Sequence, residues 1–547
     1  MTVTRISPVS SVTAALKART LQEFISHSKD VTGGNLGFPR QVADLEYTSP
    51  QQIWCMADTA ARKYMAAGLS ASERQVIGLR NLSTLDLVIA FVAVARLGHA
   101  VLLLSPHLEA AKISYLMDKA GSSLVIDGTD DRDALAALGK TVIPLETVES
   151  LGGKPLGRPA GGSEDCVMAP ELWSQLSETD AAIIMHSSGS TGPPKLIPKT
   201  HLELMTRLRA IPAFCHDKSY FMGSWLYFPV GVFGMLFGLV KPGGPTCWAN
   251  EKLPLGPEAY RDVLVEMRPQ MAWYNPSNLI HSMATPEGLG ILKQCIMVST
   301  TGQVMPERLA NRLVKEGVHL SNEYGMSELA FALSSGGRRP GDPEWEYMSA
   351  NPECAPHLWF RPLEPSEGNT WGVSDSQVYE LVVLPSHPTQ DKRYANSPDG
   401  SFRTQDVFVR HPNGEERYKC IGRMSDDIKI APQSDSVGMR ALDYEHKVQA
   451  GNEDILQEAV LFGNDRQRAG VFLFTRPGCT LSSEEVVERV WATVQREING
   501  VMAEGLDKDM LIVVRDAVVP RTPKGNFVRH EVYLKFENEM NEAYGVV

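Results

Sequence analysis

The chain has 547 residues, too many for one hydrophobic core, so we expect about three or four domains or subdomains. Its formal net charge of -12 is spread along the chain, which argues against nucleic acid or an anionic membrane as the main partner. The eight cysteines include no Cys-x-x-Cys pair, and no apolar run reaches about 18 residues. The sequence therefore excludes a cysteine-rich zinc site and a membrane span, and it predicts reduced thiols in the cytoplasm.

Strand and helix patterns alternate in the first part of the chain. Short apolar runs at 76–79, 100–104 and 123–126 predict strands, and 87–95 predicts an apolar helix. Such alternation indicates parallel sheets covered by helices. We therefore expect an α/β fold with a large N-terminal domain of helix-covered sheets over residues 1–424.

A loop rich in glycine and hydroxyl side chains follows the apolar run Ala181–Met185. It begins at Ser187 and ends at Lys195. Its backbone N–H groups, hydroxyls and lysine suit a polyphosphate, although the spacing is not that of the P-loop. Composition alone would fit a flexible linker, but the ordered pattern of Leu196–Arg209 continues directly after it.

This loop resembles the phosphate loop of the adenylate-forming enzymes, whose pattern is Ser-Ser/Thr-Gly-Ser/Thr-Thr-Gly-x-Pro-Lys. Every position matches. The resemblance implies that Lys195 and the loop bind ATP, and that Thr191 also acts in catalysis. The remaining loop residues with this implied role are Ser187, Ser188, Gly189, Ser190 and Gly192.

A second motif, Asn322-Glu323-Tyr324-Gly325-Met326-Ser327-Glu328, is similar to the family's Tyr-Gly-x-Thr/Ser-Glu. It implies that Asn322 and Tyr324 bind the nucleotide, with the aromatic ring over the adenine. It also implies that Glu328 is catalytic and holds Mg²⁺ through hard oxygen ligands. Taken alone, the same heptad would be an ordinary turn and helix start.

A third motif, Arg403-Thr404-Gln405-Asp406, resembles the family's Arg/Tyr-Thr-Gly-Asp. An ionised carboxylate is an acceptor only, so Asp406 is suited to take both ribose hydroxyls as donors. Gln405 replaces the usual glycine of the turn. Gly422-Arg423 follows, and Arg423 is implied as a second ribose or phosphate contact.

The pattern changes after Arg423. Apolar runs at 455–462, 471–474 and 510–514 predict strands, and 482–498 predicts an amphipathic helix. We expect a small α+β domain over 425–547 that is hinged to the large domain. In the family this domain rotates between the two half-reactions. The expected hinge residues are Ser425 and Asp426.

The segment Arg521–Arg529 resembles the family's Pro-x-Gly-Lys motif, but Asn526 stands at the usual lysine position. The one lysine here is Lys524, two residues earlier, and on an extended chain it would lie on the same face. We therefore expect Lys524 to be the catalytic lysine that stabilises the developing charge. The alternative is a solvated loop lysine in a site without this group.

A narrower resemblance is to the adenylation domains of fungal nonribosomal-peptide-synthetase-like and carboxylic acid reductase-type enzymes. It rests on Thr-Pro-Lys-Gly-x-x-x-Arg and on residues 458–470, although 431–440 lack the family's usual turn. No carrier motif follows residue 529, and no dinucleotide fingerprint is present. We expect an isolated adenylation unit whose carrier domain lies on a parent protein or acts in trans.

The substrate class follows from an absence. Amino-acid-activating relatives place an Asp after the phosphate loop to hold the α-ammonium, and Lys218–Lys252 contains no Asp. An unpaired buried ammonium would be costly, so we expect an acid without an α-amino group, aryl or α-keto. Plain core residues are the alternative for the expected pocket lining, which is Tyr227, Phe228, Tyr274, Asn275, Ser299, Thr300, Gly302, Gln303 and Phe331.

Three functions fit these observations. The first is MgATP-dependent adenylation of such an acid, followed by transfer to the phosphopantetheine thiol of a carrier protein. The second is a free-standing acyl- or aryl-CoA ligase. The third is a degenerate, non-catalytic nucleotide binder, which the residues Asn526, Gln405 and Ser425 favour.

Overall fold

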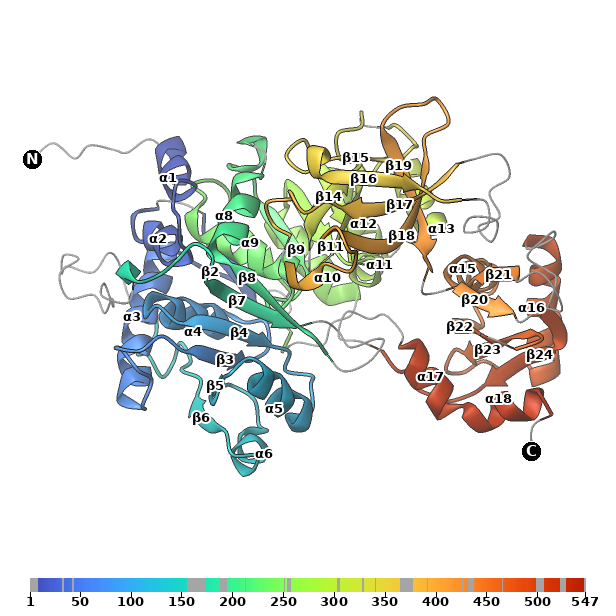
Figure 1. Cartoon of the computed structure of the whole chain (residues 1–547), viewed down its shortest axis with the longest axis horizontal. Helices are drawn as coiled ribbons and strands as arrows, with labels where there is room; N and C mark the ends of the chain where they lie inside the picture. Colours follow the sequence, from blue (N-terminus) through green and yellow to red (C-terminus); the bar gives the residue numbers. More distant parts are fainter. Residues whose placement is uncertain are drawn as a thin grey trace, which may run out of the picture. The chain divides into compact units, whose positions relative to one another are not determined.

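The computed structural model contains several sheets with helices packed against them (Figure 1). The chain divides into two compact units. Unit 1 consists of Met1–Met305, Leu313–Phe331 and Arg338–Pro343, and unit 2 of Pro306–Arg312, Ala332–Gly337 and Glu344–Val547. The structure describes residues 8–31, 34–41, 44–154, 173–186, 194–211, 213–249, 251–252, 257–302, 305–326, 329–339, 341–364, 377–390, 392–424, 427–430, 437–464, 466–497, 506–521 and 528–545.

Unit 1 contains a six-stranded sheet in the order β6-β5-β3-β4-β7-β8. The strands from β6 to β7 are parallel, and β8 is antiparallel to β7. This confirms the parallel sheet that the alternating pattern predicts. The strand bounds are β3 (Val76–Arg80), β4 (Ala100–Leu104), β5 (Leu124–Asp127), β6 (Thr141–Pro144), β7 (Ala181–His186) and β8 (Leu196–Thr200).

Helix α4 (Leu85–Arg96) connects β3 to β4 and is the predicted apolar helix. Almost all of its side chains are buried, because it packs against α3 (Pro50–Ala66) as well as against the sheet. The start of α3 is fixed by a capping box in which Ser49 and Gln52 bond each other's backbone. The shorter helices here are α5 (Ala110–Lys119) and α6 (Arg132–Ala137).

A second set of strands in unit 1 has the order β13-β12-β11-β9-β10-β1-β2. All neighbours are parallel except β2, which is antiparallel to β1. The bounds are β1 (Leu36–Gln41), β2 (Asp44–Thr48), β9 (Tyr220–Gly223), β10 (Thr246–Trp248), β11 (Met271–Tyr274), β12 (Met297–Thr300) and β13 (Leu320–Met326).

Helix α9 (Pro229–Val240) lies within the long apolar tract of the sequence and packs against β1, β9 and β10. Helix α8 (His201–Arg209) follows β8 and begins with a second capping box, formed by Thr200 and Glu203. The other helices of this region are α1 (Pro8–Ala15), α2 (Leu21–Ser26), α10 (Pro257–Met267), α11 (Pro276–Met283), α12 (Pro286–Leu292) and α13 (Glu307–Lys315).

Unit 2 contains an antiparallel sheet in the order β16-β17-β18-β19-β15-β14. Its core includes the buried side chains of Val378, Val407 and Val409. The strand bounds are β14 (Ala330–Ser334), β15 (Met348–Ala350), β16 (Leu358–Pro362), β17 (Val378–Val383), β18 (Phe402–Arg410) and β19 (Arg417–Arg423).

The C-terminal part of unit 2 has the α+β pattern predicted from the sequence. Strands β22 (Leu456–Phe462), β23 (Ala469–Thr475) and β24 (Leu506–Val514) form a sheet, and α16 (Ser483–Glu497) packs against it. The expected boundary at 424/425 and the hinge residues Ser425 and Asp426 lie outside the described residues, so both stay predictions. The remaining elements are β20 (Asp427–Ile430), β21 (Val437–Arg440), α15 (Ala441–Ala450), α17 (Arg529–Lys535) and α18 (Glu537–Ala543).

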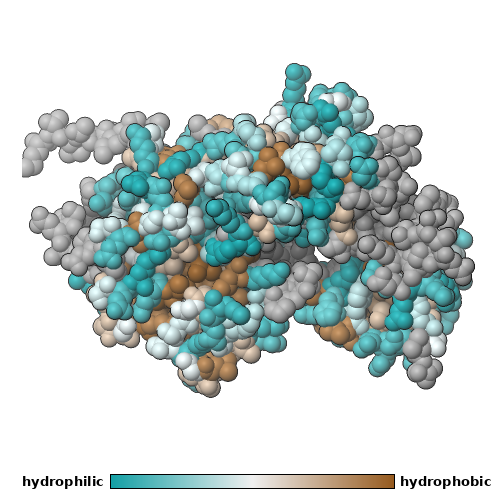
Figure 2. Space-filling model, in the orientation of Figure 1, coloured by the Kyte–Doolittle hydropathy of each residue, from teal (hydrophilic) through white to brown (hydrophobic). Residues whose placement is uncertain are grey.

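The surface is largely polar, with hydrophobic residues gathered over the six-stranded sheet of unit 1 in the view of Figure 2. Within the part of the chain that the structure describes, no helix is both long enough and apolar enough to cross a membrane.

Candidate functional site

The phosphate loop follows β7 at the carboxyl edge of the six-stranded sheet. His186, the last residue of β7, is buried and accepts a hydrogen bond at Nε2 from the backbone N–H of Ser105 (3.1 Å). Ser105 follows β4, so this bond links the ends of two neighbouring parallel strands. After the loop, Pro194 is buried and Lys195 is exposed. The residues between them and His186, from Ser187 to Pro193 and including Thr191, lie outside the described residues, so their roles stay predictions.

The second histidine near the loop, His201, has a structural role. Its Nδ1 accepts a hydrogen bond from the backbone N–H of Leu21 (3.0 Å), the first residue of α2. Burial, aided by the positive charge of Arg74, lowers the pKa of His201 to about 4. The neutral ring thus supplies the lone pair that this donor needs.

Three of the expected site residues form a row across neighbouring parallel strands. The registers pair Tyr274 of β11 with Thr300 of β12, and Thr300 with Asn322 of β13. Paired residues of a sheet face the same side, so these residues share one face near the carboxyl ends of the strands. Tyr324 lies two residues after Asn322 on that same face, and both side chains are half-buried. The structure therefore brings together two of the residues expected at the nucleotide and two of those expected at the acid.

Ser299 faces the opposite side of the sheet from Thr300, because consecutive strand residues alternate. Its hydroxyl donates to Glu323 Oε1 (3.4 Å), which also accepts from Ser321 Oγ (2.5 Å). All three side chains are buried. Ser299 is thus part of a polar contact between β12 and β13, away from the Thr300 row.

Other expected lining residues are buried as well. Tyr274 is fully buried, and its ring packs against Phe221 with centroids 5.3 Å apart. Asn275 is buried and precedes α11, and Gly302, with φ of +84°, lies beside its side-chain oxygen. Phe331 lies in β14, whereas Gln303 and Glu328 fall outside the described residues. Their roles in the pocket, and the Mg²⁺ role of Glu328, stay predictions.

Tyr227 takes part in a polar cluster that the sequence did not indicate. Its hydroxyl donates to Glu251 Oε1 (2.5 Å), whose side chain is only 5% exposed. The same carboxylate pairs with His107 Nε2 (2.6 Å) and accepts from the backbone N–H of Ser83 (2.8 Å). Phe228 is buried beside Tyr227, with ring centroids 4.8 Å apart. The only sequence signal for Glu251 is a charge three residues after the short buried strand β10, which is a common pattern.

In unit 2 the third motif lies on β18. Arg403 is bound to the buried carboxylate of Glu380, and Thr404 Oγ1 donates to the carbonyl of Leu381 (2.8 Å). Gln405 has φ of +62°, so it keeps the left-handed turn that glycine would favour. Asp406 is held by Arg423 of β19, from Nε to Oδ1 at 2.6 Å and from Nη2 to Oδ2 at 3.2 Å. The structure thus brings together the two expected nucleotide residues of this unit.

The loop that contains Lys524 lies outside the described residues, but both of its flanks are fixed. Before it, Arg521 pairs with Glu458 Oε2 at 2.5 Å. After it, Arg529 is bidentate to Glu445, at 2.5 Å to Oε1 and 2.9 Å to Oε2. Burial raises the pKa of Glu458, against the opposing effect of Arg521. The role of Lys524 stays a prediction.

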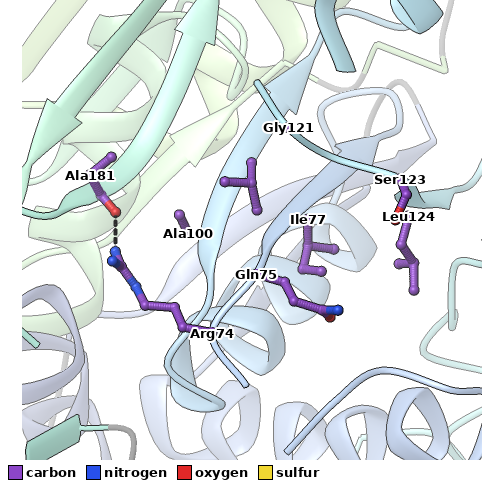
Figure 3. Close-up of a pocket in the computed structure, with 9 residues that line it drawn as sticks. Arg74, Gln75, Ile77, Ala100, Gly121, Ser123, Leu124 and Ala181 are labelled. Atoms are coloured by element: carbon purple, nitrogen blue, oxygen red, sulfur yellow. Dashed lines mark hydrogen bonds between the residues drawn. The ribbon is translucent and has the colours of Figure 1, made fainter. Parts of the chain in front are cut away.

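A cavity of about 380 Å³ lies at the amino ends of β3, β4, β5 and β7 (Figure 3). Arg74 lies at its edge, where it donates to the carbonyl of Ala181 (2.5 Å) and pairs with Asp180 (3.2 Å). Ligands of such sheets bind at the carboxyl ends of the strands. This cavity is therefore at the opposite edge from the loop after β7.

Comparison with known proteins identifies the family. Residues 41–358 match the AMP-binding enzyme family, and residues 437–547 match the AMP-binding enzyme C-terminal domain. The chain belongs to the AMP-binding enzymes.

Two relatives are adenylate-forming reductases of fungi. Nps11 of Serpula lacrymans is 24% identical over 402 residues, which cover 69% of this chain and 35% of the relative. The reductase stbB of Stachybotrys bisbyi is 24% identical over 479 residues, which cover 84% of this chain and 42% of the relative. The chain therefore spans less than half the length of either relative.

Solved structures show the same fold. ATP-bound MatB from Rhodopseudomonas palustris has a TM-score of 0.70 at 15% identity and covers 95% of this chain and 99% of its own. The McyG A-PCP structure with phenylalanyl-adenylate has a TM-score of 0.71 at 16% identity, and the match covers 96% of this chain and 84% of the McyG chain. These similarities confirm the expected fold class, a large sheet-rich N-terminal domain followed by a small C-terminal domain.

Proposed function

We propose that this enzyme adenylates a carboxylic acid without an α-amino group, an aryl or α-keto acid, and passes it to a carrier-protein phosphopantetheine thiol in the cytoplasm. The proposed substrate class rests on the hydrogen bonds that the Glu251 carboxylate already accepts. Glu251 is the one acidic residue of Lys218–Lys252, and three donors of the protein already bind its carboxylate. No carboxylate of this segment is left to hold an ammonium group, which would be costly to bury unpaired.

The residues divide the first half-reaction between them. Asp406 would accept the ribose hydroxyls while Arg423 orients it. The loop from Ser187 to Lys195 would hold the phosphates, and Lys524 would stabilise the charge that develops as the carboxylate attacks the α-phosphate. Mg²⁺, held by Glu328, would neutralise the phosphate oxygens.

The acceptor is proposed from the relatives. The McyG structure contains an A-PCP pair, and adenylate-forming reductases are longer than this chain. A CoA ligase is the second candidate, because the anthranilate CoA ligase AuaEII, crystallised with anthranoyl-AMP, has a TM-score of 0.70 at 14% identity. A degenerate nucleotide binder is the third.

Carboxylate-dependent ATP–pyrophosphate exchange tests the proposal without any thiol. The panel is benzoic, cinnamic, α-keto, fatty and amino acids, and we expect exchange with one of the aryl or α-keto classes. Exchange with α-amino acids alone would contradict the substrate class. No exchange with any acid, in protein shown to be folded by circular dichroism, would favour the degenerate binder.

A further inference from the structure

His107 lies at the same edge of the six-stranded sheet as the phosphate loop. It follows β4, whose neighbour β7 runs directly into that loop. Ser105, two residues before His107, is tied to His186 at the end of β7 (3.1 Å). Since parallel strands end at one edge, His107 lies at the edge where β7 ends and the predicted phosphate loop begins.

The backbone on both sides of His107 is fixed by one guanidinium. Arg80 Nη2 donates to the carbonyls of Pro106 (2.9 Å) and Leu108 (3.0 Å), and its side chain is 1% exposed. Arg80 is in turn paired with Asp127 at 3.3 Å. The position of the imidazole is therefore set by a buried network, as a preorganised reacting group requires.

The carboxylate of Glu251 sets the tautomer of this imidazole. It accepts at Oε1 from His107 Nε2 (2.6 Å), so Nε2 carries the proton and Nδ1 has the lone pair. The His107 side chain is 49% exposed, whereas that of Glu251 is 5% exposed. A buried carboxylate thus orients an imidazole whose side chain is about half exposed.

Resting on the proposed function, we propose that His107 is the general base of the second half-reaction. Nδ1 takes the proton as the thiol S–H bond breaks. The sulfur forms a bond to the acyl carbon, the bond from that carbon to the phosphate oxygen breaks, and AMP leaves with the electron pair. Glu251 is a positioning residue that holds the ring and stabilises the imidazolium.

This base would make more of the acceptor thiol reactive, because the thiolate is the attacking species. A free thiol has a pKa of about 8.5, so only a few per cent is thiolate at pH 7. General-base catalysis typically contributes about 10²- to 10⁴-fold. Glu251 bonds the His107 ring, and the ring of Tyr227 packs edge-on against it with centroids 6.4 Å apart. Burial raises the pKa of Tyr227 well above its usual value, so Tyr227 stays a neutral donor.

The test separates the two half-reactions in the full chain. Exchange measures adenylation, and single-turnover transfer from preformed acyl-AMP to free pantetheine measures thioester formation. For His107→Gln we expect transfer to fall by about 100-fold and exchange to fall far less. Glu251→Gln should lower transfer by about 10-fold, and His357→Gln, in unit 2, is the matched control.

Two further readouts distinguish a base from a structural role. The transfer rate of the unaltered enzyme should rise with pH along a limb of the profile that His107→Gln lacks. An acidic aromatic thiol should restore much of the lost rate. Equal loss in both half-reactions, or no loss of transfer, would overturn the inference, whereas absent exchange in the unaltered enzyme would count against the proposed function.

Discussion

Arg423 holds Asp406 through two parallel hydrogen bonds, from Nε to Oδ1 at 2.6 Å and from Nη2 to Oδ2 at 3.2 Å. The carboxylate is 9% exposed and the guanidinium side chain 44%. This bidentate geometry fixes the carboxylate plane before any nucleotide binds. In the proposed function, this arrangement would orient the carboxylate toward the two hydroxyls of a ribose.

We expect Asp406→Asn to raise the KM for ATP by about 10-fold or more, because hydrogen bonds to a charged group contribute about 1.5–3 kcal/mol. The ATP dependence of pyrophosphate exchange measures this. Asp399→Asn, a change of a fully exposed aspartate in the same unit, should leave the KM as it was. An unaltered KM in Asp406→Asn would show that the ribose binds elsewhere.

Lys524→Ala should lower exchange by about 10²- to 10³-fold, as for the loss of one group that stabilises transition-state charge. ATP affinity should change little, which equilibrium binding can check. In the double variant Lys524→Ala/Asn526→Lys, a lysine at the usual family position should restore part of the rate. If Lys524→Ala exchanges at the normal rate, Lys524 is only a solvated loop residue.

The Glu445–Arg529 ion pair predicts that a single and a double variant differ in their free energy of unfolding. Removing one partner of a buried pair leaves an uncompensated charge, so Glu445→Gln should cost about 3–5 kcal/mol. Replacing both by leucine should cost less than the single change, although the backbone N–H of Leu461 then loses Glu445 as its acceptor and its carbonyl keeps only Tyr533 of its two side-chain donors. Thermal melting of all three proteins measures the coupling, and a double variant as unstable as the single one would refute it.

His201 predicts a loss of stability at acid pH. Its pKa is about 4 in the folded chain and about 6.5 when unfolded, so the unfolded state binds the extra proton first. Stability contributed by the neutral ring is therefore complete above pH 6.5 and is lost as pH falls toward 4, by about 3 kcal/mol at most. In His201→Asn the Oδ1 atom can still accept from Leu21 without titrating, so the Tm difference between the two proteins should shrink or reverse on acidification.

Gln405→Gly tests the turn before Asp406. A left-handed conformation costs a non-glycine residue about 1–2 kcal/mol, which the extra chain entropy of glycine partly offsets. We expect a Tm that is equal or slightly higher, with the KM for ATP unaltered. Gln405→Val should melt lower, since β-branched residues are outliers at positive φ. A lower Tm in the glycine variant would indicate that the Gln405 side chain contributes contacts of its own.

The local pattern of apolar residues was sufficient to predict many of the strands and helices. Strands β3, β4, β5 and β22 lie within a residue or two of the apolar runs that predict them, because fully buried strands are continuous apolar runs. The pairing of Arg403 with buried Glu380 was not visible in the sequence, since the two residues are 23 positions apart on neighbouring strands.

The cluster around Glu251 could not be predicted either, because its members are still farther apart in the sequence. It joins Ser83, His107 and Tyr227, which follow different strands of both sheets of unit 1. Ser299 and Thr300 were expected side by side, but the pleat of β12 turns them to opposite faces. Such placements depend on strand order and register, which short motifs do not contain.

The antiparallel turn back from β7 into β8 has an electrostatic consequence. In folds where a phosphate loop leads directly into a helix, the helix dipole contributes about half a positive charge. Here β8 follows the loop, and the next helix, α8, begins only at His201. In the proposed function, neutralisation of the triphosphate would then come from backbone amides, side-chain cations such as Lys195 and a divalent ion. We therefore expect ATP binding to weaken steeply with ionic strength.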